Sequence, residues 1–241
     1  ATRLIASLGL RYSHAETKFV PGQIFELPAQ QLALFLRTLF TCDGSVYVTK
    51  RGNTGVSYST ISRRLAEDVQ HLLLRFGLTA RLRTKSQRVN DQLYTAYEVE
   101  LFGVRATRRF LATIGIVGRE QAKERLGALP EPMAESTRID TVPTGPVFWE
   151  HLRAVGGLSF AAISARAGVF IRDRRHERPL CRSTLVALAE AYPSTYLQTL
   201  AQNDIYWDEV VAVESAGQER VYDISVPGPA NFVANDLIIH N

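Results

Sequence analysis

The last two residues, His240 and Asn241, follow a run of three apolar residues and form a pair that can break a peptide bond. The side-chain amide of an asparagine can attack its own main-chain carbonyl, form a succinimide and release the residue that follows. A neighbouring histidine can donate a hydrogen bond to that carbonyl or protonate the leaving group. The pair therefore indicates autocatalytic cleavage of the chain directly after Asn241.

Asp43 is the second candidate for chemistry, because it closes a predicted apolar helix that begins near Pro28 and stops at Gly44. A carboxylate at that end of a helix is disfavoured by roughly 0.3–1 kcal/mol, since it faces the negative end of the helix dipole. Two interpretations are open. Asp43 is either a solvated capping residue or a ligand of a divalent cation, which prefers carboxylate oxygens and offsets the unfavourable field.

Basic side chains at alternate positions mark a third candidate site. Arg81, Arg83 and Lys85 lie two residues apart in a predicted strand, so they project from one face of a sheet. Two twisted strands with such a face can lie in the major groove of DNA, although a solvated sheet face gives the same pattern. Together with the ends of the predicted hairpins, the expected DNA contacts here are Lys50, Arg51, Arg81, Arg83 and Arg88.

Alternating helices and hairpins are needed to position these residues. Apolar residues at helical spacing predict helices, and alternating apolar and polar residues separated by polar turns predict strands. The expected elements are a helix over residues 28–44, strands over 45–50 and 56–59, a helix over 62–76, strands over 78–85 and 93–102, and a helix over 105–114.

This αββαββα order, with the nonapeptide 36–44 that ends in an acidic residue and a glycine, resembles a LAGLIDADG homing endonuclease half-domain. The resemblance implies that Asp43 and Gly44 bind Mg²⁺, which is shared with a carboxylate from the first motif. That first motif is expected upstream of Ala1, so cleavage needs either the missing half or a homodimer. It also implies that Lys85 is the lysine of the catalytic site, where it stabilises charge or positions the attacking water.

A second DNA-binding candidate follows a charged and then proline-rich linker. Residues 158–169 resemble the first helix and turn of a helix-turn-helix, and residues 183–192 resemble its later helix. Basic residues between these two segments can contact phosphates. They are Arg172, Arg174, Arg175, His176 and Arg178. The alternative is an ordinary helical insertion with a solvated basic loop.

The C-terminal residues carry the most specific pattern. Strands are predicted over residues 206–213 and 221–226, with a strand and turn over 231–236. Residues 206–241 as a whole resemble the C-terminal splicing blocks of inteins from bacterial replicative helicases. The resemblance implies that Asn241 cyclises, that His240 is its immediate helper and that Asp223 coordinates the splicing steps.

Four positions depart from these family patterns. Arg37 and Thr38 stand where small residues usually let two LAGLIDADG helices pack closely, and Thr41 stands where a further aspartate is common. Ala230 stands where many inteins carry a histidine, which removes a group that could transfer a proton.

Composition is compatible with these interpretations. The 241 residues are 46% hydrophobic, which is ample for two domain cores, and a formal charge of +4 is compatible with nucleic-acid binding. Two cysteines fit a reduced compartment better than a disulfide framework, and no stretch resembles a membrane span or a signal peptide. We therefore expect a cytoplasmic protein with no membrane partner. No phosphate-binding loop is present, so helicase activity is not expected in this stretch.

The sequence thus predicts an α+β chain in five parts. Residues 1–27 are the end of a preceding endonuclease half and a lead-in, 28–127 an endonuclease half-domain, 128–146 a linker, 147–203 a helix-turn-helix-like module, and 204–241 the C-terminal strands of a Hint-type splicing domain. The predicted protein excises itself from a helicase precursor and cuts double-stranded DNA at its insertion site with Mg²⁺. Its expected partners are the N-terminal part of the intein and the host segments. The alternative is a splicing-only or DNA-binding remnant with an inactive endonuclease.

Overall fold

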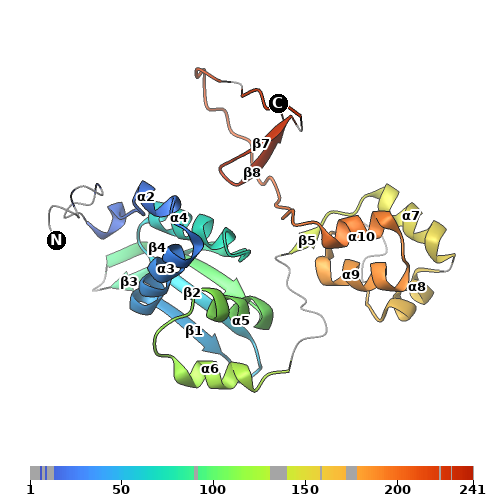
Figure 1. Ribbon diagram of the computed structural model, residues 1–241, viewed down its shortest axis with the longest axis horizontal. Coiled ribbons are helices and arrows are strands. Elements are labelled where there is room, and N and C mark those ends of the chain that lie inside the picture. Colours follow the sequence, from blue (N-terminus) through green and yellow to red (C-terminus); the bar gives the residue numbers. More distant parts are fainter. Residues whose placement is uncertain are drawn as a thin grey trace. The chain divides into compact units, whose positions relative to one another are not determined.

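The computed structural model describes Ala6, Gly9 and residues 14–89, 92–130, 140–157, 159–171, 178–222, 224–228 and 230–240. The chain divides into two compact units, residues 1–207 and residues 208–241. The first unit contains an α/β part and a helical part (Figure 1). Each of these parts has its own buried core. In the described part of the chain, no helix is long and apolar enough to cross a membrane.

The α/β part is built on a four-stranded antiparallel sheet with the strand order β1-β2-β4-β3. Its elements are η1 (Ala15–Thr17), α2 (Gly22–Phe25), α3 (Ala29–Asp43), β1 (Gly44–Val48), β2 (Thr54–Thr60), α4 (Arg63–Leu74), β3 (Arg81–Val89), β4 (Gln92–Phe102), α5 (Val104–Thr113) and α6 (Glu120–Gly127). From α3 to α5, the elements follow the predicted αββαββα order.

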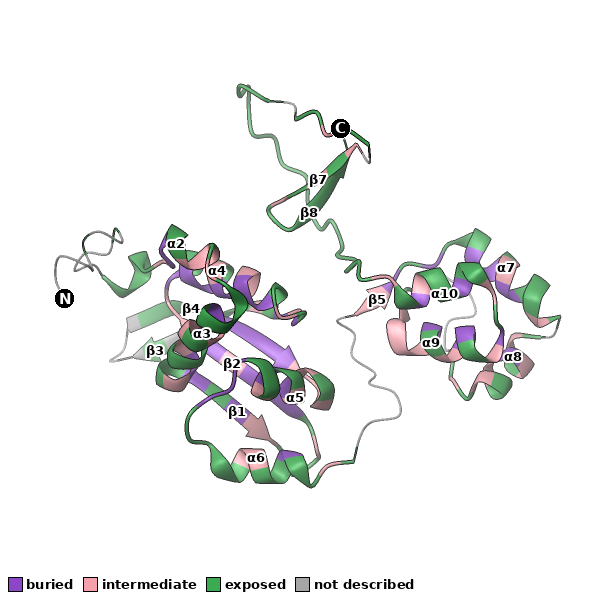
Figure 2. Ribbon diagram, viewed as in Figure 1, coloured by how far each residue is buried: buried purple, intermediate pink, exposed green. Residues whose placement is uncertain are grey.

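The core of this part lies between the sheet and helices α3, α4 and α5 (Figure 2). Alternate residues of the strands face it, and Val56, Tyr58 and Val99 are buried there. The ring of Phe40 on α3 packs against those of Tyr58 and Phe110, with centroids 5.5 and 4.8 Å apart. Side chains alternate between the two faces of a strand, so the period-two runs in the sequence indicate these strands correctly.

Three elements of the α/β part differ from the sequence-based expectation. The β3–β4 hairpin continues to Val89 and Gln92, where a loop over residues 86–92 is expected, because pairing satisfies backbone groups of both strands. The lead-in forms the one-turn helix α2 where extended chain is expected. Helix α6 lies in the charged segment between the last helix expected in the half-domain and the linker, where no helix is expected. Only Leu126 of α6 is buried, so its helical periodicity is weak.

The helical part contains α7 (Pro146–Gly156), α8 (Phe160–Ala167), α9 (Arg182–Ala191) and α10 (Thr195–Gln202), with the short pair β5 (Thr141–Val142) and β6 (Leu180–Cys181). Helix α8 ends at Gly168, whose φ of 64° matches the tight turn predicted after the first helix. Helix α10 is not anticipated by the sequence analysis. Its first turn is capped by Ser194, whose side chain accepts a hydrogen bond from the Leu197 N–H.

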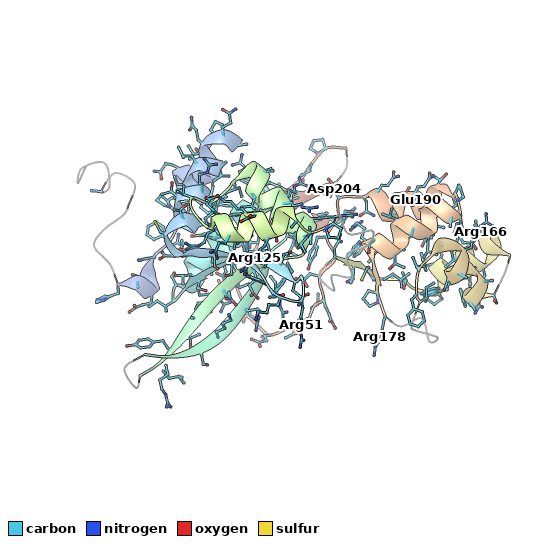
Figure 3. All side chains as sticks on the ribbon, turned by 90° about the horizontal axis from the view of Figure 1, so that it is seen from below. Arg51, Arg125, Arg166, Arg178, Glu190 and Asp204 are labelled. Carbon is cyan, nitrogen blue, oxygen red and sulfur yellow. The ribbon has the colours of Figure 1, made fainter. Side chains whose placement is uncertain are left out.

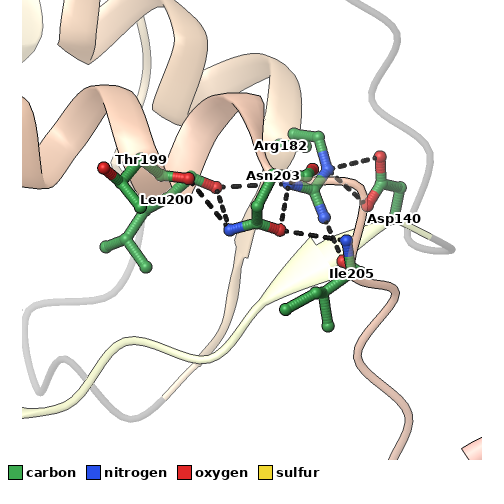
Figure 4. A network of polar contacts seen from close by, with 6 residues as sticks. All are labelled: Asp140, Arg182, Thr199, Leu200, Asn203 and Ile205. Atoms are coloured by element: carbon green, nitrogen blue, oxygen red, sulfur yellow. Dashed lines mark hydrogen bonds and ion pairs between the residues drawn. The ribbon is translucent and has the colours of Figure 1, made fainter. Parts of the chain in front are cut away.

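Arg182, the first residue of α9, holds the beginning and the end of the helical part together (Figure 4). Its Nε donates to both carboxylate oxygens of Asp140, at 2.9 and 3.0 Å. Its Nη atoms donate to the carbonyl oxygens of Leu200, Asn203 and Ile205. Because the Arg182 side chain is only 17% exposed, these charge-assisted bonds close the helical part on itself between residues 140 and 205.

Among the described residues of the second unit, β7 (Asn231–Ala234) and β8 (Leu237–His240) form a hairpin. Its turn residues Asn235 and Asp236 have positive φ, as the two-residue turns of twisted hairpins require. The strands predicted over residues 206–213 and 221–226 are wrong, since the described residues there adopt no strand. A strand needs a partner for its hydrogen bonds and a surface for its apolar side chains, and the described residues of this unit provide neither for these segments.

Candidate functional site

Asp43 is the last residue of α3, and it lines a pocket of about 320 Å³. Leu32, Leu36 and Phe40 face the core one turn apart, which fixes the direction of the helix and leaves Asp43 exposed at its end. The helix ends at Gly44, where an added Cβ would lie 2.5 Å from the carbonyl oxygen of Phe40. Only glycine allows this close approach of the backbone, so the chain turns from α3 into β1 directly beside Asp43.

Tyr58 of β2 lines the same pocket. Burial raises the pKa of its hydroxyl to about 12, and the nearby Asp43 carboxylate and Cys42 thiol add to this effect. A hydroxyl that stays protonated can donate a hydrogen bond beside the carboxylate. The pocket therefore combines one anionic oxygen ligand with one neutral donor.

Lys18 also lines this pocket, and the backbone that follows its side chain is bonded to α4 and its N-cap. The Ser62 hydroxyl donates to the Lys18 carbonyl oxygen at 2.5 Å, and the Val20 N–H donates to the Asp68 carboxylate at 2.8 Å. Between these two bonds, the Arg64 guanidinium lies 4.6 Å from the centre of the Phe19 ring. These contacts fix the lead-in so that Lys18 is kept at the pocket with Asp43.

The metal ligands implied by the family resemblance fit a cation only in part. Asp43 offers an exposed carboxylate, but the Gly44 carbonyl oxygen accepts a hydrogen bond from Nη2 of Arg119 at 3.2 Å. Among the residues that the structure describes, no group of three or more His, Cys, Asp or Glu side chains could hold a metal ion. Mg²⁺ demands octahedral coordination by oxygen atoms, so Asp43 and Gly44 supply only part of a site.

Lys85 lies outside the set of residues that line the Asp43 pocket. Its ammonium group pairs with the Glu98 carboxylate on the neighbouring strand β4. Arg83 pairs in the same way with Glu100, at 3.0 Å. Two of the three basic residues predicted to face DNA from β3 are therefore partnered within the sheet itself.

The other predicted site residues divide into exposed positions and positions outside the described residues. Lys50 and Arg51 are exposed in the turn between β1 and β2, where Figure 3 labels Arg51. On β3, Arg81 and Arg88 are exposed, and His240 is exposed at the end of β8. The residues outside the described part are Arg172, Arg174, Arg175, His176, Asp223 and Asn241.

Sequence reasoning does not single out Lys18, Tyr58 or Arg119. Lys18 and Tyr58 line the pocket with Asp43, and Arg119 bonds to Gly44. These residues are far apart in the chain, so no local pattern predicts that they are neighbours. A usable signal exists only for Tyr58, because it shares the inward face of β2 with Val56 and that face must pack against a helix.

Similarity to known proteins agrees with this architecture. Residues 30–115, which run from α3 to the end of α5 and two residues beyond it, match the family described as LAGLIDADG-like domain. The matched stretch contains the αββαββα elements, Asp43 and all four strands of the sheet. Residues 30–115 of this chain are therefore similar to a LAGLIDADG-like domain.

Matches along the whole chain are to larger proteins. The chain is 33% identical to the replicative DNA helicase DnaB of Synechocystis sp. over 100% of its own length, and 35% identical to that of Rhodothermus marinus over 98%. It is 32% identical to elongation factor 2 of Methanopyrus kandleri over 89% of its length. The chain spans 28%, 26% and 16% of the lengths of these three relatives, respectively.

Proposed function

We propose that this chain is part of an intein in a replicative DNA helicase, and that it joins a LAGLIDADG homing endonuclease to the C-terminal part of a splicing domain. The main support for the proposal is that nearly the whole chain matches a small part of several larger proteins with unrelated names. At least 89% of the chain matches two helicases and an elongation factor, yet it spans 28% or less of each. Proteins with such different names share this segment. The simplest explanation is that the segment was inserted into each of them, and not that they have a common activity.

In the endonuclease part, Asp43 is the proposed metal-binding carboxylate, completed by a carboxylate from the first motif. Mg²⁺ bound there supplies Lewis-acid activation of the attacking water. Tyr58 offers a neutral hydrogen-bond donor at the same pocket, and a lysine ammonium stabilises charge on the phosphate. The geometry favours Lys18 over Lys85 for this role, because Lys18 lines the pocket and Lys85 pairs with Glu98.

In the splicing part, Asn241 attacks its own main-chain carbonyl, His240 donates a hydrogen bond to that carbonyl, and Asp223 assists. Support comes from the exposed apolar side chains of the second unit, where Val211 and Val213 are 89% and 91% exposed. Side chains of this kind indicate a surface that packs against another protein segment. The N-terminal part of the intein is the proposed segment.

The helical part is proposed to bind DNA through the basic residues that follow α8, namely Arg172, Arg174 and Arg175. With the exposed Lys50, Arg51, Arg81 and Arg88, these residues give several positive groups for phosphate contacts. The proposed partners are the double-stranded insertion site and the flanking host segments, and the proposed location is the cytoplasm.

An intein with an inactive endonuclease is the second candidate, and two contacts beside Asp43 favour it. The Thr41 hydroxyl accepts a hydrogen bond from the Val117 N–H at 3.1 Å, so a neutral side chain with a structural role stands where the family often has an acid. Arg119 brings a positive charge to the Gly44 carbonyl oxygen. Both contacts oppose the assembly of a metal site.

The test uses the complete insertion with a few host residues on each side, expressed as the wild type and as Asn241→Ala. Mass spectrometry is expected to find a species ending at Asn241 only in the wild type. The same protein is incubated with the uninterrupted host-gene duplex, with Mg²⁺ or with EDTA, alongside Asp43→Asn. Metal-dependent DNA cleavage that this variant loses supports the full proposal. Peptide cleavage without DNA cleavage selects the second candidate, and the absence of both rejects the intein proposal.

A further inference from the structure

Helix α8 of the helical part has a solvent-facing side without carboxylates. The helix contains no acidic residue, and its three exposed residues are Ala161, Ala165 and Arg166. The two alanines lie one turn apart, so they share one side of the helix. The Ser159 side chain caps the first turn by accepting a hydrogen bond from the Ala162 N–H. This side of α8 therefore allows a negatively charged partner to come close.

Two arginines are held at the two ends of α8 by aromatic rings. The Arg153 guanidinium lies 4.6 Å from the centre of the Phe160 ring, and the Arg166 guanidinium, labelled in Figure 3, lies 4.8 Å from that of Tyr192. Arg166 follows Phe160 by six residues, which is about 9 Å along the helix axis. Both rings are fixed, because Tyr192 is buried and Phe160 contacts the Trp149 ring edge-on. Each cation thus has a defined place on the surface.

The N–H groups of these two arginines are available to an external acceptor. Stacking uses the face of a guanidinium group, whereas its five N–H bonds lie in the plane of the group. Neither the Arg153 nor the Arg166 guanidinium forms a hydrogen bond or an ion pair with any residue that the structure describes. Other arginines use their N–H groups within the fold and donate to backbone carbonyl oxygens, namely Arg75, Arg108, Arg109, Arg119 and Arg182.

We infer that α8 lies against the sugar-phosphate backbone of duplex DNA, with Arg153 and Arg166 each bonded to a phosphate group. This inference rests on the proposed DNA binding, and it places the contact on α8 itself and not only on the basic segment that follows it. The planar donor edge of an arginine matches two oxygens of one phosphate, and the alanine side of α8 permits close approach. Phosphate contacts fix position and orientation on a duplex without reading its sequence.

A salt titration of DNA binding tests this inference. The complete insertion is prepared as the wild type, Arg153→Gln, Arg166→Gln and the double variant, with Arg153→Lys and Arg166→Lys to keep the charge without the planar fork. Fluorescence anisotropy measures binding to the host-site duplex and to a scrambled duplex over a series of salt concentrations. The matched control is Arg63→Gln, which removes the same charge from the exposed Arg63–Glu67 pair on α4. Thermal unfolding shows whether each variant keeps its fold.

Each glutamine substitution is expected to weaken binding to both duplexes equally, by about tenfold, and to reduce the slope of log affinity against log salt by about 0.9. The lysine variants should keep the wild-type slope but bind both duplexes more weakly, because they lose the bidentate contact. They replace the glutamine variants in the comparison if the latter unfold. Arg63→Gln should change neither quantity.

Wild-type affinity and slope in the Arg153 and Arg166 variants overturn the inference alone. A loss confined to the host-site duplex also overturns it, since contacts to phosphates act on every sequence. If the wild type binds neither duplex, the inference falls together with the proposed DNA binding.

Discussion

The sheet of the α/β part and the second unit contain the same strand-forming residue types but bury them very differently. Val56 and Val99 of the sheet are 0% and 1% exposed, whereas Val211 and Val213 are 89% and 91% exposed (Figure 2). Full burial of one such side chain stabilises a fold by about 1.5–3 kcal/mol, so only the sheet gains this energy. Alternation of apolar and polar residues in the sequence therefore predicts which side chains share one face of a strand. The strand forms only where its apolar face packs against another part of the protein.

The two regions also differ in whether the residues proposed for chemistry are held in place by packing. In the α/β part, Asp43, Tyr58 and Lys18 are brought together by packing within one core. In the second unit, the described segment over residues 208–222 has neither helix nor strand. The proposed peptide cleavage at Asn241 consequently depends on a partner segment, while the architecture around Asp43 is already formed.

Backbone amide exchange should show the largest difference between the two regions. Amides of α4 and β4 exchange through unfolding of the core, so we expect them to be slower than unstructured amides by about 10³–10⁸. Amides of residues 208–222 should exchange near the intrinsic rate. Mass spectrometry of pulse-labelled peptides measures both, and addition of the N-terminal part of the intein should protect residues 208–222. Slow exchange there in the isolated 241-residue chain would contradict the comparison.

Substitutions at the two chemical centres should have separate effects. Asp43→Asn is expected to lower DNA cleavage by more than about a hundredfold, since even the outer partners of metal ligands can cost that much. Peptide cleavage after Asn241 should be unchanged in that variant, because the two reactions use different residues. Asn241→Ala should give the opposite result. Both rates are measured on the complete insertion with host flanks, and a loss of both activities in either variant would contradict the separation.

Sequence reasoning predicted the α/β elements well because each has a strong local signal. The helix ending at Asp43 has Leu32, Leu36 and Phe40 one turn apart and a glycine at its end, and the structure confirms it as α3. The strands of the sheet carry period-two patterns, and the structure confirms them as β1 to β4. The segment 221–226 carries the same alternation and the segment 206–213 ends in an apolar run, so both predict strands, but the surface needed to bury them is not part of any local signal.

Tertiary contacts explain what the sequence did not reveal about the site. The ion pairs of Arg83 and Lys85 depend on the register between β3 and β4, which places Glu98 and Glu100 beside them. Arg182 likewise looks like one more basic residue in the sequence, yet its partners lie 18 to 42 residues away. Roles set by such distant partners follow from the fold and not from residue type.

Matched substitutions of core and exposed side chains should differ by several kcal/mol. Phe110→Ala removes a fully buried ring that packs against Phe40, so we expect the free energy of unfolding to fall by about 3–5 kcal/mol. Val213→Ala at an exposed position should change it by less than about 0.5 kcal/mol. Urea denaturation of the 241-residue chain, followed by circular dichroism, measures both. A large loss from Val213→Ala would show that residues 208–222 are already packed in this chain.

The smallest expected effect concerns Tyr58 at alkaline pH. The folded state raises the pKa of its hydroxyl to about 12 through burial and the nearby Asp43, whereas the unfolded chain has the ordinary value near 10. The folded state therefore binds this proton more tightly, and its stability is fully present below pH 10 and falls as the pH rises towards 12.

Tyr58→Phe should remove this part of the pH dependence while changing stability at pH 7 by no more than about 1.5 kcal/mol. Tyr222→Phe, at a tyrosine that is 80% exposed in the second unit, is the matched control. Urea midpoints between pH 8 and pH 11 compare the three proteins. If the wild type and Tyr58→Phe lose stability in parallel over this range, the hydroxyl is not held protonated by the core, and the pocket beside Asp43 is open to water in solution.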